Sequence, residues 1–271
     1  MGFDIPMNSK GAMDLSSLSS MMSGGLTPPQ QQMQQAPMNN NFNQPQPQMN
    51  NYQQAPMQQP MQPQPQMQQT PVQQKQRPAG GGVHLKKGQK VGLVAAGGGA
   101  LTNIQVCLGW DIMNQACDLD ASAFMLGVDG RVLGDDWFVF YGQTTSPDGS
   151  IRHSGDSTNG AAMGDDEIID INLQTINPNV KKITFVVTIN EALERGLNFS
   201  MVANAYVRVV DKTTGQELNR FQLTDYYANV TSMVVGEVYN HNGQWKFNAV
   251  GDGVAKDLAG LCAMYGVNVA D

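Results

Sequence analysis

Between residues 84 and 269 several short segments alternate apolar and polar residues with a period of two. Such alternation is typical of half-buried strands, because successive side chains of a strand point to opposite faces, whereas a helical pattern repeats about every 3.6 residues. The last two segments flank His241-Asn242-Gly243-Gln244, whose Asn-Gly pair favours the positive φ angles of a tight turn and predicts an antiparallel hairpin. The clearest segments are residues 137–141, 183–189, 201–210, 233–239 and 245–250.

Short strands separated by Gly, Asp and Asn turns, without long helical patterns between them, favour an all-β fold and a β-sandwich. Two short helices are also expected. The first covers residues 191–195, is capped by Asn190 and ends at Gly196. The second covers residues 254–265, and we interpret its apolar stripe as core packing. The stripe consists of Val254, Leu258, Leu261, Cys262 and Tyr265.

Residues 1–82 form a separate region dominated by Gln, Met, Asn and Pro, and residues 83–271 form the expected folded domain. The first region contains too little apolar surface to offset an ordering entropy of about 1–2 kcal/mol per residue, so we expect a disordered tail. Tracts rich in Gln and Asn also condense or aggregate readily, which gives the hypothesis that the tail mediates self-association.

The charge of the chain argues against a nucleic-acid partner. Its net charge is −7. The charged residues before residue 83 are Lys10, Lys75, Arg77, Asp4 and Asp14, which sum to +1, so the rest of the chain carries −8. Binding to phosphates requires a basic face, whereas an acidic domain suits cations. No apolar run approaches the roughly 18 residues of a membrane span, and no signal-peptide pattern follows Met1, so we expect a cytoplasmic protein.

The three cysteines, Cys107, Cys117 and Cys262, share no C-x-x-C spacing and have few histidines near them in the sequence. A soft-metal site normally needs four such ligands at characteristic spacings. We therefore expect free, buried thiols in a reducing compartment.

Two acidic segments carry the candidate chemistry. The first is Asp118-Leu119-Asp120, where an extended chain would place both carboxylates on the same side. The second is the Gly-rich loop of residues 155–167, which ends in three consecutive acids and contains no Lys or Arg. Desolvated carboxylates need hydrogen bonds or a cation, and Ca²⁺ accepts about six to eight oxygen ligands in flexible geometry. The two segments therefore predict a Ca²⁺ site.

The loop is not an EF-hand, although Asp156 and Glu167 occupy the first and twelfth positions of such a motif. Its third position is Thr158, its glycine is at the fifth position instead of the sixth, and its flanks are strand-like. Three other acids, Asp135, Asp136 and Asp148, are interpreted as exposed turn residues.

Single features of the sequence suggest two other functions. A metal-dependent hydrolase could use the acidic segments as ligands and general base, but His84, His153 and His241 form no recognisable constellation and no G-x-S-x-G motif occurs. We interpret His153 as a packing residue and expect no enzymatic activity. A nucleotide site at residues 97–99 lacks G-K-[ST] or a complete G-x-G-x-x-G, so these glycines are expected to form a turn.

The sequence resembles the TerD family, named for tellurium resistance, over essentially all of residues 84–269. The resemblance implies a β-sandwich that binds two Ca²⁺ ions through acidic loops and is encoded in bacterial operons for tellurite resistance and wider stress or phage defence. The segments that carry it occur in the same order with similar spacing. They are residues 118–124 (DLDASAF), 138–141 (FVFY), 146–149 (SPDG), 153–156 (HSGD), 164–167 (GDDE), 198–199 (NF), 204–209 (NAYVRV) and 243–247 (GQWKF).

The same resemblance implies a function and a set of ion ligands. It implies a calcium-binding stress-response domain that acts as an ion-stabilised scaffold or interaction module. Its expected partners are Ca²⁺ and other Ter-type stress-response proteins, including membrane-associated ones. The implied ligands are Asp118, Asp120, Asp156, Asp165, Asp166 and Glu167, with Asn159 contributing its amide or main chain.

The loop departs from the family pattern GDNxTGEGDGDDE. Ser157, Asn159, Ala161, Ala162 and Met163 replace its Asn, Thr, Glu, Gly and Asp, so two acids are missing. Fewer charged ligands predict a lower affinity or the loss of one ion.

Overall fold

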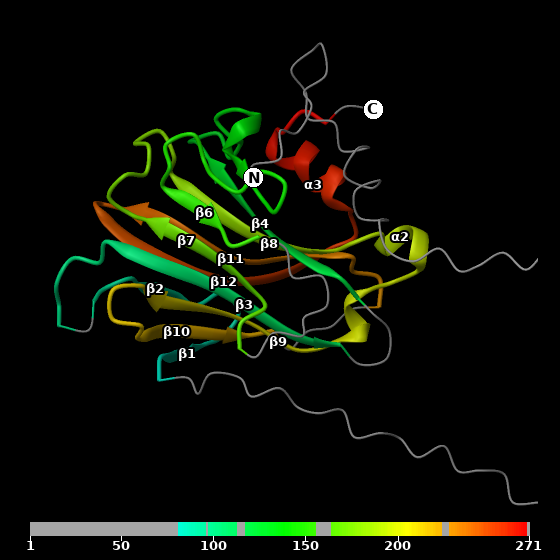
Figure 1. Cartoon of the computed structure of the whole chain (residues 1–271), viewed down its shortest axis with the longest axis horizontal. Coiled ribbons are helices and arrows are strands. Elements are labelled where there is room, and N and C mark those ends of the chain that lie inside the picture. Colours follow the sequence, from blue (N-terminus) through cyan, green and yellow to red (C-terminus); the bar gives the residue numbers. More distant parts are fainter. Residues whose placement is uncertain (1–80, 96, 113–116, 156–163, 224–227, 270–271) are drawn as a thin grey trace, which may run out of the picture. The chain divides into compact units, whose positions relative to one another are not determined.

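The computed structural model describes residues 81–95, 97–112, 117–155, 164–223 and 228–269. The predicted tail lies outside these residues, apart from Gly81 and Gly82. The described residues form two six-stranded sheets, and Figure 1 shows them with short helices at their periphery.

The first sheet has the order β1-β10-β9-β3-β7-β6, in which β1 and β10 are parallel and the other pairs are antiparallel. Its strands are β1 (Val83–Leu85), β3 (Asn103–Ile112), β6 (Ile151–His153), β7 (Glu167–Asn172), β9 (Val202–Asp211) and β10 (Glu217–Gln222).

The second sheet has the order β2-β12-β11-β8-β4-β5 and is antiparallel throughout its described pairs. Its strands are β2 (Lys90–Gly92), β4 (Leu119–Leu126), β5 (Phe138–Val139), β8 (Lys182–Ile189), β11 (Ser232–His241) and β12 (Gln244–Val254). The helical segments are η1 (Asp135–Trp137), α2 (Ala192–Arg195), η2 (Phe199–Met201) and α3 (Leu258–Tyr265).

Strand β4 shows how the layers are built. Leu119, Ala121 and Ala123 belong to the large apolar cluster that both sheets share, so this face of β4 lies between the sheets. The alternate residues Phe124 and Leu126 belong to a second cluster on the outer face of the same sheet, which α3 covers. Every residue of β4 is therefore buried, and the all-β sandwich with a few short helices is confirmed.

The predicted hairpin at residues 241–244 is also confirmed. Asn242 and Gly243 have φ angles of 53° and 81°, and they join β11 to β12 in antiparallel register. The positive φ angles of both central residues match the twist of the flanking strands, which explains the Asn-Gly pair.

Other local predictions were wrong in their boundaries. Residues 137–141 form a strand only at Phe138–Val139, because Phe140 and Gln143 exchange backbone hydrogen bonds in a turn that ends the ladder. Helix α3 begins at Leu258 with Asp257 as its N-cap, and Val254 belongs to β12. Leu261 and Cys262 of α3 are buried, so its apolar residues do pack in the core.

The expected cap of the first helix was also wrong. Glu191, with a φ of 51°, is the N-cap of α2 and makes no side-chain capping bond, whereas the Asn190 amide donates to Asp118 at 3.4 Å. Gly196, with a φ of 64°, ends the helix as expected.

We predict that Gly236→Ala destabilises the sandwich. Gly236 lies in the buried middle of β11, where an added Cβ would come within 2.5 Å of the Phe247 ring. Overpacking of this kind costs about 1–3 kcal/mol in the free energy of unfolding, measurable by urea denaturation. A second substitution, Phe247→Leu, should recover part of the loss. Gly92→Ala on edge strand β2, where a Cβ meets nothing within 4 Å, is the control, and equal destabilisation by both alanines would contradict this packing.

Candidate metal centre

The first acidic segment lies at the start of β4. Asp120 pairs in register with Thr188 of β8 and is only 6% exposed. Asp118 precedes the strand, and its backbone carbonyl oxygen accepts a hydrogen bond from the backbone nitrogen of Asn190 at 2.8 Å. Asp118 and Asp120 flank Leu119, which faces the core between the sheets. Because strand side chains alternate, Asp120 belongs to the opposite, outer face of this sheet.

Glu167 approaches the same segment from the other sheet. It is the first residue of β7 and shares the inward face with Ile169, so its carboxylate is fully buried between the sheets. Its Oε2 accepts a hydrogen bond from the backbone nitrogen of Ala121 at 2.5 Å. This contact joins two residues that lie 46 positions apart in the sequence, Ala121 directly after the first acidic segment and Glu167 at the end of the second.

His153 completes the contact with Ala121. Its Nδ1 accepts a hydrogen bond from the Gly155 nitrogen at 3.0 Å, so Nε2 carries the proton and donates to the Ala121 carbonyl oxygen at 3.0 Å. The same Nε2 lies 3.5 Å from Glu167 Oε2, and both side chains are fully buried. The interpretation of His153 as a packing residue is confirmed by its burial, and the hydrogen bonds add a role that the sequence did not indicate.

The backbone N–H and C=O of Ala121 are therefore both hydrogen-bonded to side chains of the first sheet. In an antiparallel strand the N–H and C=O of one residue point to the same side, and here they point away from β8. The neighbouring strand β5 pairs only with Ala123 and Phe124 and leaves the edge of β4 open at Ala121. Glu167 and His153 occupy this edge and connect the two sheets, and we call their contacts with Ala121 the Ala121 bridge.

Asp166 extends the pairing of β3 and β7 by one residue. Its backbone nitrogen donates to the Leu108 carbonyl oxygen at 2.8 Å, and its Oδ2 accepts from the Trp110 nitrogen at 2.9 Å. The residue is 7% exposed. Two hydrogen bonds to β3 thus fix Asp166 immediately before Glu167.

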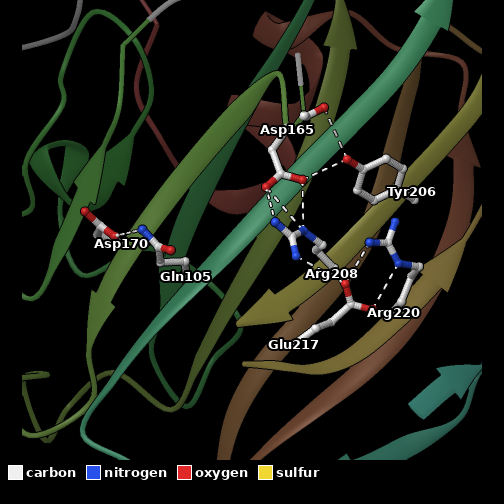
Figure 2. A network of polar contacts seen from close by, with 8 residues as sticks. Gln105, Asp165, Asp170, Tyr206, Arg208, Glu217 and Arg220 are labelled. Carbon is white, nitrogen blue, oxygen red and sulfur yellow. Dashed lines mark hydrogen bonds and ion pairs between the residues drawn. The ribbon is translucent and has the colours of Figure 1, made fainter. Parts of the chain in front are cut away.

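Asp165 has a different environment, although it directly precedes Asp166. Figure 2 shows its carboxylate facing Arg208 and Tyr206 of β9. Arg208 donates from Nε to Oδ1 at 2.9 Å and from Nη2 to Oδ2 at 2.6 Å, and the Tyr206 hydroxyl donates to Oδ1 at 2.7 Å. The sequence indicated no cation within the loop, but the fold supplies one from a strand about 40 residues away.

The Asp165 pair is part of a larger network on the outer face of the first sheet. Arg208 Nη1 also contacts Glu217 Oε2 at 3.2 Å, and Glu217 in turn accepts hydrogen bonds from Arg220. The Arg220 guanidinium stacks 4.3 Å above the Tyr206 ring centre. Burial acts to lower the pKa of Arg208, but the hydrogen bonds and negative charge of Asp165 outweigh it and raise the pKa above its ordinary value. Arg208 is therefore a permanent positive charge.

The three cysteines are free and buried, as predicted. Burial raises the pKa of Cys262 to about 12 and also raises the pKa of Cys107 and of Cys117 above the ordinary value. Their thiols are protonated at neutral pH, and a soft metal needs the thiolate. The thiols therefore do not suit a soft metal, whereas the carboxylate oxygens of the acidic segments are the ligand type that a hard cation such as Ca²⁺ prefers.

The structure joins the two predicted acidic segments at one point, the hydrogen bond between the Ala121 nitrogen and Glu167. Asp120 directly precedes Ala121 but belongs to the outer face of the second sheet, the Asp166 carboxylate bonds to β3, and Asp165 turns to the outer face of the first sheet. Asp156 and Asn159 lie outside the described residues. Within the described parts of the chain, no three His, Cys, Asp or Glu side chains form a group that could hold a metal ion.

Asp135 and Asp148, two of the acids predicted to be exposed turn residues, accept hydrogen bonds in the fold. Asp135 accepts a hydrogen bond from the Asn268 nitrogen at 2.8 Å. Asp148 is half-buried and accepts from the Ser146 hydroxyl, the Ser150 nitrogen and hydroxyl and the Asn177 nitrogen. The interpretation of Asp148 as an exposed turn residue was therefore incomplete, because its long-range partner Asn177 is not evident from the sequence.

Comparison with known proteins identifies the family of this chain. The TerD domain family matches residues 82–265, and the chain belongs to this family. Over 191 residues it is 45% identical to "Tellurium resistance protein TerD" of Serratia marcescens and 41% identical to "General stress protein 16U" of Bacillus subtilis (strain 168). Each alignment covers 69% of this chain, and they cover 99% and 98% of the two relatives.

The fold also matches a solved structure, described as that of a protein of unknown function, SAV2460. The TM-score is 0.50 at 23% sequence identity, and the match covers 59% of this chain and 94% of the other. Within the described residues, no helix has the length and apolar character needed to cross a membrane.

We predict that Asp148→Asn lowers the free energy of unfolding at neutral pH by about 1 kcal/mol. This is less than the loss of a fully buried, hydrogen-bonded carboxylate would cost, because Asp148 is partly exposed to water. Partial burial acts to raise the pKa of Asp148, but its hydrogen bonds from Ser146, Ser150 and Asn177 outweigh this effect and leave the pKa below its ordinary value. A depressed pKa stabilises the fold above the unfolded value and loses this effect as pH falls through the folded value. The stability difference between the two proteins should therefore shrink below about pH 4. Urea unfolding at several pH values measures it, and a difference independent of pH would contradict the assignment.

Proposed function

We propose that this TerD-family chain is a cytoplasmic, non-catalytic Ca²⁺-binding module of the stress response, in which the ion fixes the acidic loops and thereby shapes an interaction surface. The observation that carries the proposal is the contact of Glu167 with Ala121, which brings the second acidic segment to the first. The names of the relatives, a tellurium resistance protein and a general stress protein, support the stress-response setting.

The proposed ion compensates buried negative charge. Asp120, Asp166 and Glu167 are each less than 10% exposed and come from two different sheets. A desolvated carboxylate is destabilising unless hydrogen bonds or a cation offset the loss of water. Backbone N–H groups supply part of this offset to Asp166 and Glu167, and a shared hard cation would supply more.

The proposed ligand set is the one implied by the family resemblance without Asp165, whose carboxylate pairs with Arg208. Asp118, Asp120, Asp166 and Glu167 would bind the ion from the two acidic segments, and Asp156 and Asn159 would complete the site from the loop. An ion held by both segments would connect the β4 end of one sheet to the β7 end of the other. Other Ter-type proteins, including membrane-associated ones, are the proposed partners of the surface formed there, and the N-terminal tail is a proposed site of self-association.

A hydrolase is the weaker alternative. The three histidines lie on different strands, with His84 on β1, His153 on β6 and His241 on β11. His153 uses both ring nitrogens for hydrogen bonds to the backbone and is fully buried. A general base must reach a substrate proton, so His153 is poorly placed for that role.

The test is a Ca²⁺-dependent thermal melt of the full-length protein. A ligand specific for the folded state stabilises it by RT ln(1 + [L]/Kd), about 2.7 kcal/mol at a hundredfold excess over Kd. For a domain of this size this corresponds to a rise in Tm of about 5–10 °C. We expect Asp118→Asn with Asp120→Asn to abolish the rise.

The control is Asp129→Asn in an exposed turn, where Asn can still accept the hydrogen bond from the Arg131 nitrogen. This variant should retain the full Ca²⁺ effect. A wild-type melt that does not change at millimolar Ca²⁺ would contradict the proposed function.

A further inference from the structure

We propose that Asp165 is a positioning residue that fixes the exit of the acidic loop through Arg208, and that it is not a ligand of the ion. This inference deepens the proposed function and rests on it for the ion, but the ordering role of Asp165 can be measured without any ion. It separates Asp165 from Asp166 and Glu167, with which it forms a continuous acidic run in the sequence.

The first argument is that both oxygens of Asp165 are already used. Oδ1 accepts from Arg208 Nε and from the Tyr206 hydroxyl, and Oδ2 accepts from Arg208 Nη2. The side chains of Asp165 and Arg208 are only 7% and 14% exposed. Bidentate pairs between arginine and a carboxylate are the strongest common ion pairs, and partial burial protects this one from screening by water and salt.

The second argument is electrostatic. A divalent cation at Asp165 would lie next to the guanidinium of Arg208, whose positive charge is permanent and itself held by Glu217. Like charges at such short range repel strongly in a partly buried environment. An ion bound to Asp165 would therefore have to displace Arg208. This would disrupt the network of ion pairs that continues through Glu217 to Arg220.

The third argument concerns the backbone on either side of Asp165. Gly164 has a φ of 114°, a region that favours glycine, and its carbonyl oxygen accepts a hydrogen bond from the Tyr206 hydroxyl at 3.4 Å. On the other side, the Asp166 nitrogen donates to the Leu108 carbonyl oxygen. Contacts to β9 and β3 thus hold three successive residues before Glu167 turns inward to Ala121. Fixing the backbone here holds Asp166 and Glu167 in place before an ion binds. In metal sites, residues that contact the ligands but not the metal orient the ligands in the same way.

The network offers a matched pair of control residues. Asp170 and Lys212 lie on the same outer face, with Lys212 Nζ 2.7 Å from Asp170 Oδ2, and Figure 2 shows Asp170 beside Gln105 at the edge of the network. Both side chains are more exposed, at 30% and 47%. Asp170→Asn and Lys212→Gln remove the same charges as Asp165→Asn and Arg208→Gln without a contact to Asp165.

The test compares these four variants in the full-length protein by calorimetric titration with Ca²⁺. We expect Asp165→Asn and Arg208→Gln each to weaken Ca²⁺ binding about 10–100-fold with the number of bound ions unchanged, as for other residues that orient metal ligands. The two control variants should stay within about threefold of the wild type, a margin that allows for weak screened surface electrostatics. If Asp165 were a ligand, Arg208→Gln would leave binding unchanged or tighten it beyond the Lys212→Gln value, and that result would overturn the inference.

A second measurement decides the role of Asp165 even if a single variant does not fold or the protein does not bind Ca²⁺. Removal of one partner leaves an unpaired buried charge that can destabilise the fold. The double variant Asp165→Asn with Arg208→Gln removes both charges and avoids this problem. Amide hydrogen exchange at residues 164–167 is then recorded without Ca²⁺. Faster exchange in the double variant than in Asp170→Asn supports the positioning role, and exchange equal to that of Asp170→Asn overturns it. A wild type that binds no Ca²⁺ would refute the proposed function alone, because the exchange experiment still decides the role of Asp165.

Discussion

The backbone N–H and C=O of Ala121 join the two sheets of this protein through polar contacts. Its N–H donates to Glu167 and its C=O accepts from His153, and both of those side chains belong to the opposite sheet. The large cluster between the sheets consists of apolar side chains, whose burial is a non-directional interaction. Directional hydrogen bonds in a dry interior are specific, because leaving any of these groups unsatisfied would be costly. The bridge therefore defines which residue of β4 faces the start of β7.

From this bridge the neighbouring acids diverge. Glu167 points between the sheets, Asp120 belongs to the outer face of the second sheet, and Asp165 reaches the outer face of the first. Consecutive acids in the sequence thus have separate environments, because strand geometry sends successive side chains in opposite directions. The family relationship explains the fold and supports the stress-response setting, and the proposed ion would join acids of the two segments near Ala121.

Local features of the fold could be predicted from the sequence where short-range chemistry decides them. The Asn242-Gly243 turn follows from the φ angles that these residues adopt readily, and the apolar residues of α3 follow from helical periodicity. The prediction failed where tertiary contacts decide. Residues 137–141 show strand alternation, but a turn at Phe140 leaves a ladder of only two residues.

The candidate site could be predicted only as a set of residue types. The sequence indicated that Asp118, Asp120 and the acids of 165–167 carry the oxygen ligands that a hard cation prefers, and the D-x-D spacing predicted a shared face for the first two. It could not reveal that Arg208 neutralises Asp165 or that His153 reaches Ala121, because both contacts depend on the register of strands distant in the sequence. The one available signal was the alternation at residues 206–209, which marks Arg208 as a residue of the outer face.

The central claim is that oxygens from the β4 and β7 segments share one hard cation beside the Ala121 bridge. A crystal structure of the full-length protein grown with Ca²⁺ tests it most directly. The account predicts an ion about 2.3–2.6 Å from oxygens of both the 118–120 and the 166–167 segments, with the Asp165–Arg208 pair intact. An ion bound by only one segment, or an ion bound by Asp165 after separation from Arg208, would contradict it.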